Sequence, residues 1–565
     1  MCGIWAIFGS NEDVHKYCES ACKIAHRGPD AFCLENVNHL ANCLFGFHRL
    51  AIVDDVFGMQ PMRLKNYPHI WMMYNGEIYN FKRLRDQYKF QFTSNCDGEV
   101  LIHLYAHGGI EFMAKMLDGV FAFCLLDTQT KKVFIGRDTV GVRPMFRLYL
   151  EDEGILAICS EAKGIVGLGD THNCADIEPF PPGLYEEYDL LKNGKSVFVS
   201  RQRFHSVDQV PKWALETGTP QPEDGEHQAN IRLLLTEAVR KRFMANRRIG
   251  CFLSGGLDSS LVSALVTKIA KDEGVVSYPI QTFSIGMTGS PDVAAARKVA
   301  AHIGSEHHEI GFTPEEGIEA VEEVIYSLES YDITTIRASV GMYLVAKYVK
   351  KETDTVVVLS GEGADELCQG YIYFHMAPTP EEADKESRRL LDDLYLYDVL
   401  RGDRTTAAHG LELRVPFLDH HFVSNFLSIP AKLRVPRLGV EKYILRKAFD
   451  GTGILPDEIL WRPKEAFSDG VSSTEKSWYQ VLQEFIETKV TDSMLEDAPK
   501  LYPFNPPKSK EAYYYRQIFE RSYPNRSSWI PYFWMPKWVN TDDPSARTLK
   551  HYKESDVQHS SKIDC

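Results

Sequence analysis

The chain has 565 residues, with 63 Lys and Arg against 78 Asp and Glu, a formal net charge of −15, and 44% hydrophobic residues. This composition excludes collagen, coiled coils and largely disordered chains. At about 150 residues per domain, the length predicts two to four domains, each able to bury its own core. The acidic balance argues against nucleic acid and anionic membrane surfaces as partners.

Cysteine usage and hydrophobicity indicate where the protein works. The 12 cysteines are scattered, and nine of them precede residue 175, without the dense even spacing of a secreted disulfide scaffold. No run of about 18 apolar residues is present, and Met1 to Gly9 lacks the basic leader of a signal peptide. We therefore expect a cytosolic protein without a membrane-spanning segment.

The first part of the chain predicts a layered, β-rich domain. Short strand-like runs are separated by turn residues, and Lys16 to Ala25 and Glu99 to His107 have the periodicity of amphipathic helices. The predicted strands are Gly3 to Gly9, Leu44 to Val53, Ile70 to Tyr74, Val120 to Asp127, Lys132 to Arg137 and Ile155 to Cys159.

A polar segment divides the chain. Glu216 to His227 has two prolines, two glycines and no periodicity, which is typical of a linker or a long surface loop. We place a first domain at residues 1–210, a linker at 211–228, a second domain at 229–540 and a polar tail at 541–565 that is expected to fray.

After the linker, helix-like and strand-like segments alternate. This order predicts an α/β domain with a doubly wound parallel sheet, whose ligands bind at the carboxyl ends of the strands. The predicted strands are Ile249 to Leu253, Ile280 to Ile285 and Thr355 to Leu359, and the predicted helices are Asn230 to Phe243, Ser259 to Lys271 and Val293 to Ile303.

The amino terminus carries the first candidate for catalysis. Cys2 is followed by glycine, and its small side chain should let an aminopeptidase remove Met1. Cys2 would then combine a thiol with a free α-amino group, which titrates at about 7.7 to 8.0. A nucleophile and a base would therefore share one residue. Alone, the cysteine is better explained as fortuitous.

Four motifs accompany this cysteine. They are His26-Arg27-Gly28-Pro29-Asp30, His48-Arg49-Leu50-Ala51-Ile52-Val53, Tyr74-Asn75-Gly76-Glu77-Ile78-Tyr79-Asn80 and Asp97-Gly98-Glu99. In order and spacing they resemble the class II glutamine amidotransferases across the whole first domain. The resemblance implies an α+β, four-layered (αββα) N-terminal nucleophile fold, with a glutamine site at Arg49, Leu50, Ala51, Ile52, Val53, Asn75, Gly76, Glu77 and Asp97.

The chemistry of glutamine gives these residues separate roles. Arg49 can hold the α-carboxylate with two hydrogen bonds. Asp97, and with it Glu77, offers negative charge to the α-ammonium. The Asn75 amide and the Gly76 N–H can stabilise the oxyanion that forms when the Cys2 thiolate attacks the amide carbon. Ammonia then leaves, and water hydrolyses the thioester.

Structural alternatives exist for parts of this set. Arg49 would also fit an ion pair at a strand edge. Asn75-Gly76 is also the standard sequence of a type I′ hairpin turn. We interpret His26 and Arg27 as structural or substrate-gating, because Cys2 has its own base.

A second constellation follows the predicted strand at Ile249. The sequence Ser254-Gly255-Gly256-Leu257-Asp258-Ser259-Ser260 turns from a strand into a helix, and backbone N–H groups at such a turn bind anions. The motif resembles the pyrophosphate loop of ATP pyrophosphatases, which cleave ATP between its α and β phosphates. Asp258 is placed to hold Mg²⁺ on the phosphates, and Ser254, Ser259 and Ser260 can donate to phosphate oxygens.

A second loop of this kind, within Val356 to Glu366, also follows a predicted strand. Ser360-Gly361 is followed by the carboxylates of Glu362, Asp365 and Glu366. Three carboxylates in five residues repel one another unless Mg²⁺ or a lysine balances them. Asp365 is accordingly our second metal candidate, with complementation of a helix dipole as the alternative.

Two further motifs, Asp403 to Asp419 (DRTTAAHGLELRVPFLD) and Trp461 to Gly470 (WRPKEAFSDG), extend the likeness. From Cys2 to beyond Gly470 the chain resembles the glutamine-hydrolysing asparagine synthetase family. The resemblance implies that Leu253, Ile285, Ser360 and Gly361 line the ATP site and that Glu362 takes part in forming an acyl-adenylate. It also implies that Lys464 contacts the phosphoryl groups and that Glu366 orients Lys464 or the aspartate.

The resemblance implies a reaction of aspartate, glutamine, ATP and water that gives asparagine, glutamate, AMP and pyrophosphate, in a homodimer. Ammonia would cross a dry interdomain passage. The arginine that binds aspartate stays open among Arg337, Arg401, Arg404 and Arg414. Two other interpretations remain: a β-lactam-forming or other amidating synthetase on the same frame, and a non-catalytic regulatory homologue. The first is disfavoured because the chain keeps Cys2, Arg49, Asn75, Asp97 and Lys464. The second is disfavoured because Cys2, Asp258 and Lys464 are all present.

Overall fold

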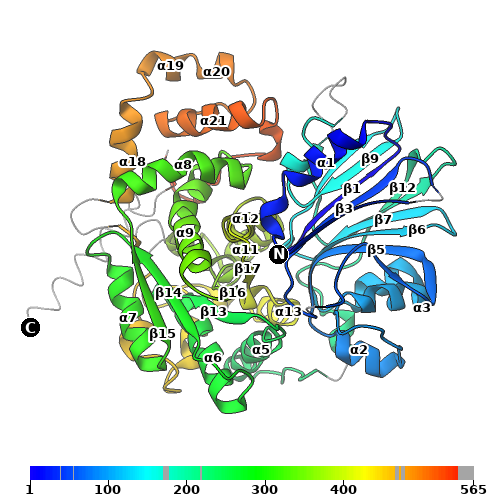
Figure 1. Ribbon diagram of the computed structural model, residues 1–565. Helices are drawn as coiled ribbons and strands as arrows, with labels where there is room; N and C mark the ends of the chain where they lie inside the picture. The colour runs from blue at the N-terminus through cyan, green and yellow to red at the C-terminus, as the bar shows by residue number, and fades with distance from the viewer. Residues whose placement is uncertain are drawn as a thin grey trace, which may run out of the picture.

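The computed structural model describes the chain except for residues 38–39, 55, 169–176, 217–218, 465–469, 473–476, 542 and 545–565. Two bodies meet along a broad junction, and the amino terminus lies at that junction (Figure 1). Most of the predicted tail and the centre of the WRPKEAFSDG motif fall outside the described residues.

The first body, here called the sandwich, contains two six-stranded sheets. The first has the order β10-β8-β9-β1-β3-β2 and the second the order β12-β11-β7-β6-β5-β4. The strands are β1 (Gly3–Phe8), β2 (Ala31–Asn36), β3 (Cys43–Arg49), β4 (Met62–Leu64), β5 (Tyr67–Ile78), β6 (Gly119–Asp127), β7 (Lys132–Arg137), β8 (Phe146–Leu150), β9 (Ile155–Cys159), β10 (Ile177–Pro179), β11 (Leu184–Leu190) and β12 (Ser196–Arg203). All the strand pairings in these two sheets are antiparallel.

Alternation along the strands explains the layering, because successive side chains point to opposite faces. In β1, Ile4, Ala6 and Phe8 belong to the core between the two sheets. Trp5 and Ile7 belong instead to the core that includes α1 (Val14–Cys22). On the outer face of the second sheet, residues of β5 share a core with α2 (Phe81–Tyr88) and α3 (Glu99–Met116). The predicted αββα order is therefore confirmed.

Two predicted elements of the sandwich differ from the structure. The strand predicted to reach Val53 ends at Arg49. The helix predicted to end at His107 continues to Met116, with non-helical φ and ψ angles at Gly109. The hairpin alternative for Asn75-Gly76 is wrong, because both residues lie inside β5 and pair with Ala122 and Phe121 of β6.

The second body, here called the parallel-sheet domain, has a five-stranded sheet in the order β15-β14-β13-β16-β17. Its strands are β13 (Arg248–Phe252), β14 (Gln281–Gly286), β15 (Glu306–Gly311), β16 (Thr355–Leu359) and β17 (Glu412–Arg414), and all pairs are parallel. The chain winds outward from β13 in one direction and returns to β16 to wind in the other. A doubly wound sheet opens a crevice at such a reversal, beyond the carboxyl ends of the two strands.

Helices complete this domain and the connection to it. Within the described residues, no helix is long and apolar enough to cross a membrane. The helices are α4 (Lys212–Glu216), α5 (His227–Lys241), α6 (Leu257–Glu273), α7 (Pro291–Ile303), α8 (Pro314–Leu328), α9 (Ile333–Glu352), α10 (Ala364–Leu367), α11 (Pro380–Asp393), α12 (Asp398–Ala407), α13 (His420–Ser428), α14 (Ala431–Arg434), α15 (Tyr443–Phe449), α16 (Asp457–Leu460), α18 (Trp478–Glu487), α19 (Asp492–Glu496), α20 (Ala498–Leu501) and α21 (Lys510–Ser522).

The junction between the two bodies is rich in buried charges. Glu161 and Lys163 of the sandwich form ion pairs with each other at 2.6 Å, and Arg404 of α12 lies 3.2 Å from Glu161. Arg404 also pairs with Glu329 at 2.9 Å. Buried ion pairs of this kind fix one relative arrangement, since breaking one leaves an uncompensated charge.

Candidate active sites

Cys2 directly precedes β1 and is partly buried. Its thiol is 3.6 Å from the carbonyl oxygen of Leu50 and receives the Leu50 N–H at 3.5 Å. Burial raises the pKa of this thiol above its ordinary value. A thiol held this way needs a nearby base to become a thiolate.

Asn75 and Gly76 have the geometry of an oxyanion site within a strand. The Asn75 side chain is completely buried, and neither its Nδ2 nor its Oδ1 hydrogen-bonds to a described residue. Gly76 has φ +149°, and a Cβ there would lie 2.0 Å from the Val120 carbonyl oxygen. Only glycine fits this close approach. Burying an amide without a hydrogen-bond partner destabilises the fold. The Asn75 amide is therefore available to donate a hydrogen bond to a bound ligand.

The two predicted acids, Glu77 and Asp97, are buried, and the cations near them do not fully offset the loss of water around their carboxylates. Asp97 accepts hydrogen bonds from the Tyr74 hydroxyl and the Ile78 N–H, each at 2.7 Å. Burial nevertheless raises the pKa of Asp97 from 3.8 to about 6. Burial, with the charges of Glu412 and Asp97, also holds the pKa of Glu77 well above its ordinary value. Such a site favours an incoming cation.

The parallel-sheet domain reaches into this site from β17. Arg414 lies 3.6 Å from Glu77 and donates to Glu412 at 2.8 Å. Sequence reasoning placed Arg414 among the candidates for binding aspartate, but its side chain pairs with Glu412 and Glu77 at the glutamine site. Glu412 was missed, because it lies in the Asp403 to Asp419 motif, to whose acids the sequence assigned no role.

The remaining predicted glutamine residues follow β3. Arg49 ends the strand and donates to the Asp54 carbonyl oxygen. Leu50 contacts Cys2, while the Ala51 N–H donates to Asp30 at 2.8 Å and the Ile52 carbonyl accepts from Asn246 at 2.8 Å. Val53 is partly buried beside them. The loop is therefore attached to the sandwich and to the parallel-sheet domain.

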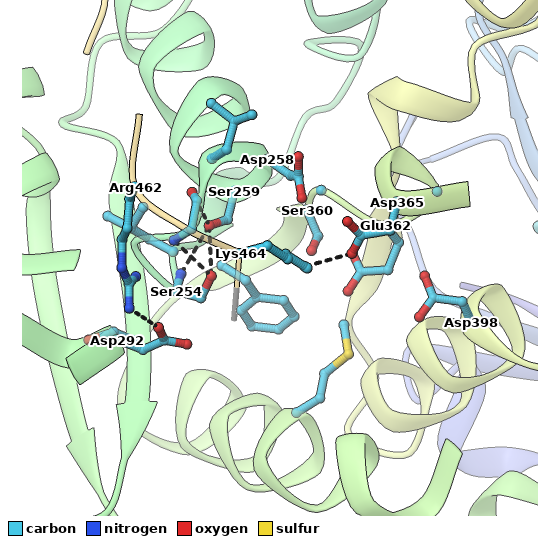
Figure 2. A pocket seen from close by; sticks show the side chains of 18 of the residues that line it. Ser254, Asp258, Ser259, Asp292, Ser360, Glu362, Asp365, Asp398, Arg462 and Lys464 are labelled. Carbon is cyan, nitrogen blue, oxygen red and sulfur yellow. Dashed lines mark hydrogen bonds and ion pairs between the residues drawn. The ribbon is translucent and has the colours of Figure 1, made fainter. Parts of the chain in front are cut away.

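A cleft lies at the crevice between β13 and β16 (Figure 2). Of the predicted ATP residues, those that line it are Leu253, Ser254, Gly256, Asp258, Ser259, Ile285, Ser360 and Gly361. Gly255 lies just behind the lining, with its carbonyl 3.1 Å from Arg462, and Ser260 is buried inside α6. A Cβ at Gly361 would lie 2.8 Å from the Asp258 Cβ, so glycine lets the two loops meet.

Lysines balance the acidic loops. Lys442 is buried and forms ion pairs with Asp258 and with Asp365, the latter at 2.5 Å. Lys464 pairs with Asp365 at 2.7 Å, as Figure 2 shows. Burial opposes ionisation of Asp365, but the two lysines more than offset it and lower its pKa. Lysine, one of the two cations expected to balance these carboxylates, is thus found beside them. Lys464 contacts Asp365, whereas the resemblance implied that Glu366 orients Lys464 or the aspartate.

Glu362 and Glu366 line the same cleft but differ in their partners. Arg401 of α12 lies 3.6 Å from Glu362, whereas Glu366 accepts from the Tyr371 hydroxyl. Burial, together with the nearby charges of Asp398 and Asp365, raises the pKa of Glu366 to about 8. Burial also raises the pKa of Glu362.

The four candidate arginines are now separated by position. Arg401 lines the cleft. Arg337 is bound to Glu511 and Asp543, and Arg404 to the junction acids. Several lining residues escaped sequence reasoning, because they come from segments that bring no motif of their own: Asp292, Asp398, Glu441, Lys442 and Arg446. Arg462 also lines the cleft; it lies in the WRPKEAFSDG motif, where only Lys464 was given a role.

Comparison with known proteins decides the family. A family model described as "Asparagine synthase" matches residues 230–381 and 376–541, and one described as "Glutamine amidotransferase domain" matches residues 1–206. The chain belongs to the asparagine synthetase family. Its similarity to the family extends over nearly the whole length, as the following relatives show.

All three relatives considered are named asparagine synthetase [glutamine-hydrolyzing]. The protein of Gallus gallus is 62% identical over 560 residues, covering 98% of this chain and 100% of the relative. That of Cricetulus griseus is 60% identical over 560 residues, with the same coverage. That of Homo sapiens is 59% identical over 562 residues, again covering 98% and 100%.

Proposed function

We propose that this chain makes asparagine from aspartate, with glutamine as the nitrogen donor and ATP as the activating substrate. The observation that carries the proposal is the presence of two sites of opposite character in one chain of this family. One holds a thiol beside acids short of cations, and the other holds lysines at a strand-end cleft.

In the sandwich, we assign glutamine to the site around Cys2. Its α-ammonium would meet Asp97 and Glu77, and Arg49 would hold its α-carboxylate. The amide carbon would then face the Cys2 thiol, with Asn75 and the Gly76 N–H directed at the oxyanion. Once Met1 is removed, the α-amino group of Cys2 takes the thiol proton and passes it to the departing ammonia.

In the parallel-sheet domain, we assign ATP to the cleft at β13 and β16. The turn at Ser254 to Gly256 and the first turn of α6 would surround the phosphates, and Lys464 and Lys442 would offset their charge. Glu362 stays close to the acyl group during adenylation. Arg401, the candidate that lines the cleft, is our choice for the aspartate carboxylate.

The donor set also fits a magnesium ion carried by the nucleotide. Asp258 Oδ1 is buried and accepts no hydrogen bond from a described residue, and Asp258 and Asp365 share Lys442. The described residues contain no group of three or more potential ligands, which suits an ion that takes most of its oxygens from phosphates and water. Bound at Asp258 and Asp365, Mg²⁺ would neutralise charge on the phosphates.

The two halves require each other chemically. Aspartate is a poor acyl donor until ATP converts it to β-aspartyl-AMP, and ammonia is reactive only when unprotonated. We therefore propose that ammonia travels from the Cys2 site to the nucleotide cleft through a passage between the two bodies, out of contact with bulk water. We also propose a cytosolic location, in keeping with ten free cysteines among the described residues, and a homodimer.

Product analysis tests this proposal. Wild type, Cys2→Ala and a control, Cys18→Ala, are given aspartate, Mg-ATP and either amide-¹⁵N glutamine or ammonium. We expect labelled asparagine, AMP and pyrophosphate from wild type and Cys18→Ala, and synthesis from ammonium alone by Cys2→Ala. The absence of AMP and pyrophosphate with both nitrogen sources would contradict the synthetase assignment.

A further inference from the structure

Helix α12 contacts both active sites. Near its start, Asp398 and Arg401 line the nucleotide cleft. Two residues further on, Asp403 points into the junction with the sandwich. Residues two apart on a helix are separated by about 200° around its axis, so Arg401 and Asp403 face opposite ways. One short helix therefore contributes a side chain to each site.

Asp403 contacts the nucleophile's backbone through one arginine. Its two carboxylate oxygens accept from the Arg27 guanidinium at 2.8 and 3.1 Å. The Nε–H of the same Arg27 donates to the carbonyl oxygen of Cys2 at 3.0 Å. Asp403 is 2% exposed and Arg27 is completely buried. The two-point pairing fixes the plane of the guanidinium, and the plane fixes where its Nε–H points.

No other described acid can substitute fully for Asp403. Glu161 also accepts from Arg27, at 2.6 Å, but it is shared with His26, Lys163 and Arg404. Through a single oxygen it cannot set the orientation that a two-point pair sets. Loss of the Asp403 charge would leave Arg27 free to turn toward Glu161 and away from the Cys2 carbonyl.

We propose that Asp403 is a positioning residue for Cys2, acting through Arg27, and that α12 conveys the state of the nucleotide cleft to the glutamine site. The inference rests on the proposed function, since it assigns Cys2 the attack on glutamine. In this arrangement the parallel-sheet domain completes the glutaminase site. Movement of Arg401 against Glu362 on binding of substrates displaces the helix that holds Asp403.

The test uses the full-length chain and measures glutamine hydrolysis without ATP. A displacement of about 1 Å costs on the order of 100-fold in rate, so we expect Asp403→Asn to lower kcat by 10- to 100-fold with little change in KM. Alkylation of Cys2 by 6-diazo-5-oxo-norleucine should slow in parallel. Asp403→Glu should recover part of the loss, which a general loss of stability would not allow.

Coupling is measured with aspartate and α,β-methylene-ATP, which resists cleavage at the adenylating bond. These ligands should change the wild-type hydrolysis rate about fivefold, within the usual range of coupling, and leave the Asp403→Asn rate unchanged. Arg27→Lys, which keeps the charge but loses the two-point geometry, should show the same defect. A double variant should lose no more than either single one, because the two residues act as one unit.

The control is Asp118→Asn, which removes another buried carboxylate paired across the junction, with Lys241 at 2.7 Å. It should keep wild-type kcat for hydrolysis and the response to ligands. A kcat within twofold of wild type in Asp403→Asn and Arg27→Lys, or a ligand response retained in them or missing from wild type, overturns the inference. Absence of glutamine hydrolysis in wild type would instead overturn the proposed function.

Discussion

The two candidate active sites differ in how their charges are balanced before any substrate binds. Around Cys2, burial leaves Glu77 and Asp97 with raised pKa values, because the cations nearby do not offset the desolvation. In the nucleotide cleft, burial likewise raises the pKa of Glu362 and Glu366, but Lys442 and Lys464 lower that of Asp365. The first site attracts a cation, and the part of the second that holds the two lysines is prepared for an anion. The ion pairs of the ligand-free protein thus indicate which charge each site receives.

The largest effect that sharpens this contrast is expected from Asn75→Ala. The buried amide stabilises charge only in the transition state, and loss of one oxyanion donor costs about 10²- to 10³-fold in kcat. The measurement is steady-state kinetics of glutamine hydrolysis. The rate of asparagine synthesis from ammonium should stay within twofold of the wild-type rate. The oxyanion assignment fails if kcat for glutamine drops by less than tenfold.

Lys442→Met tests the charge balance of the cleft. Its loss leaves Asp258 and Asp365 buried with too little positive charge, and breaking a buried pair costs about 3 to 5 kcal/mol. We expect a fall of that size in the free energy of unfolding, measured in urea, and loss of AMP formation from ammonium. Lys447→Met is the matched control, since Lys447 lies on α15, which begins directly after Lys442, and is 38% exposed. Equal stability of the two variants would contradict the account.

The pH dependence of glutamine binding follows from Asp97. Its pKa is raised to about 6 in the free protein, and the α-ammonium binds to the ionised form. As pH falls from 7 to 5 the ionised fraction drops about tenfold, so KM for glutamine should rise by about that factor. Asp97→Asn should have a high KM without this dependence. A flat profile in wild type would show that Asp97 does not bind the ammonium.

Tyr74→Phe should have the smallest effect. The Tyr74 hydroxyl donates to Asp97 at 2.7 Å and stabilises its ionised form. Removing it raises the pKa of Asp97, so the midpoint of the same KM profile should move to higher pH by up to about one unit. A shift to lower pH would contradict the assigned hydrogen bond.

The sequence predicted a layered, β-rich first body and a parallel sheet in the second, because both depend on local patterns. Strand-like runs separated by turns predicted the first and alternating helices and strands the second, whereas the αββα order was implied by the family resemblance. The hairpin alternative at Asn75-Gly76 is wrong, because this turn-like dipeptide lies inside β5, where Gly76 makes room for the Val120 carbonyl. Local turn preference gave way there to a requirement of the site.

The site was predictable where a loop carries its own motif and not where tertiary contacts bring in distant residues. Asp258, Ser360 and Asp365 belong to recognisable motifs that follow the ends of β13 and β16. Lys442, which neutralises two of those carboxylates, lies far along the chain in a segment with no distinctive pattern. Likewise, Arg27 was identified as structural or gating, but only the fold reveals Asp403 as its partner.

The central claim is that the two sites act on one molecule of ammonia within one chain. Its most direct test is a competition in which amide-¹⁵N glutamine is supplied together with unlabelled ammonium, aspartate and Mg-ATP, and the asparagine is analysed by mass spectrometry. The account predicts ¹⁵N in asparagine well above its share of the free ammonia pool. Labelling equal to that pool would show that ammonia escapes to solvent, and the two sites would then be independent.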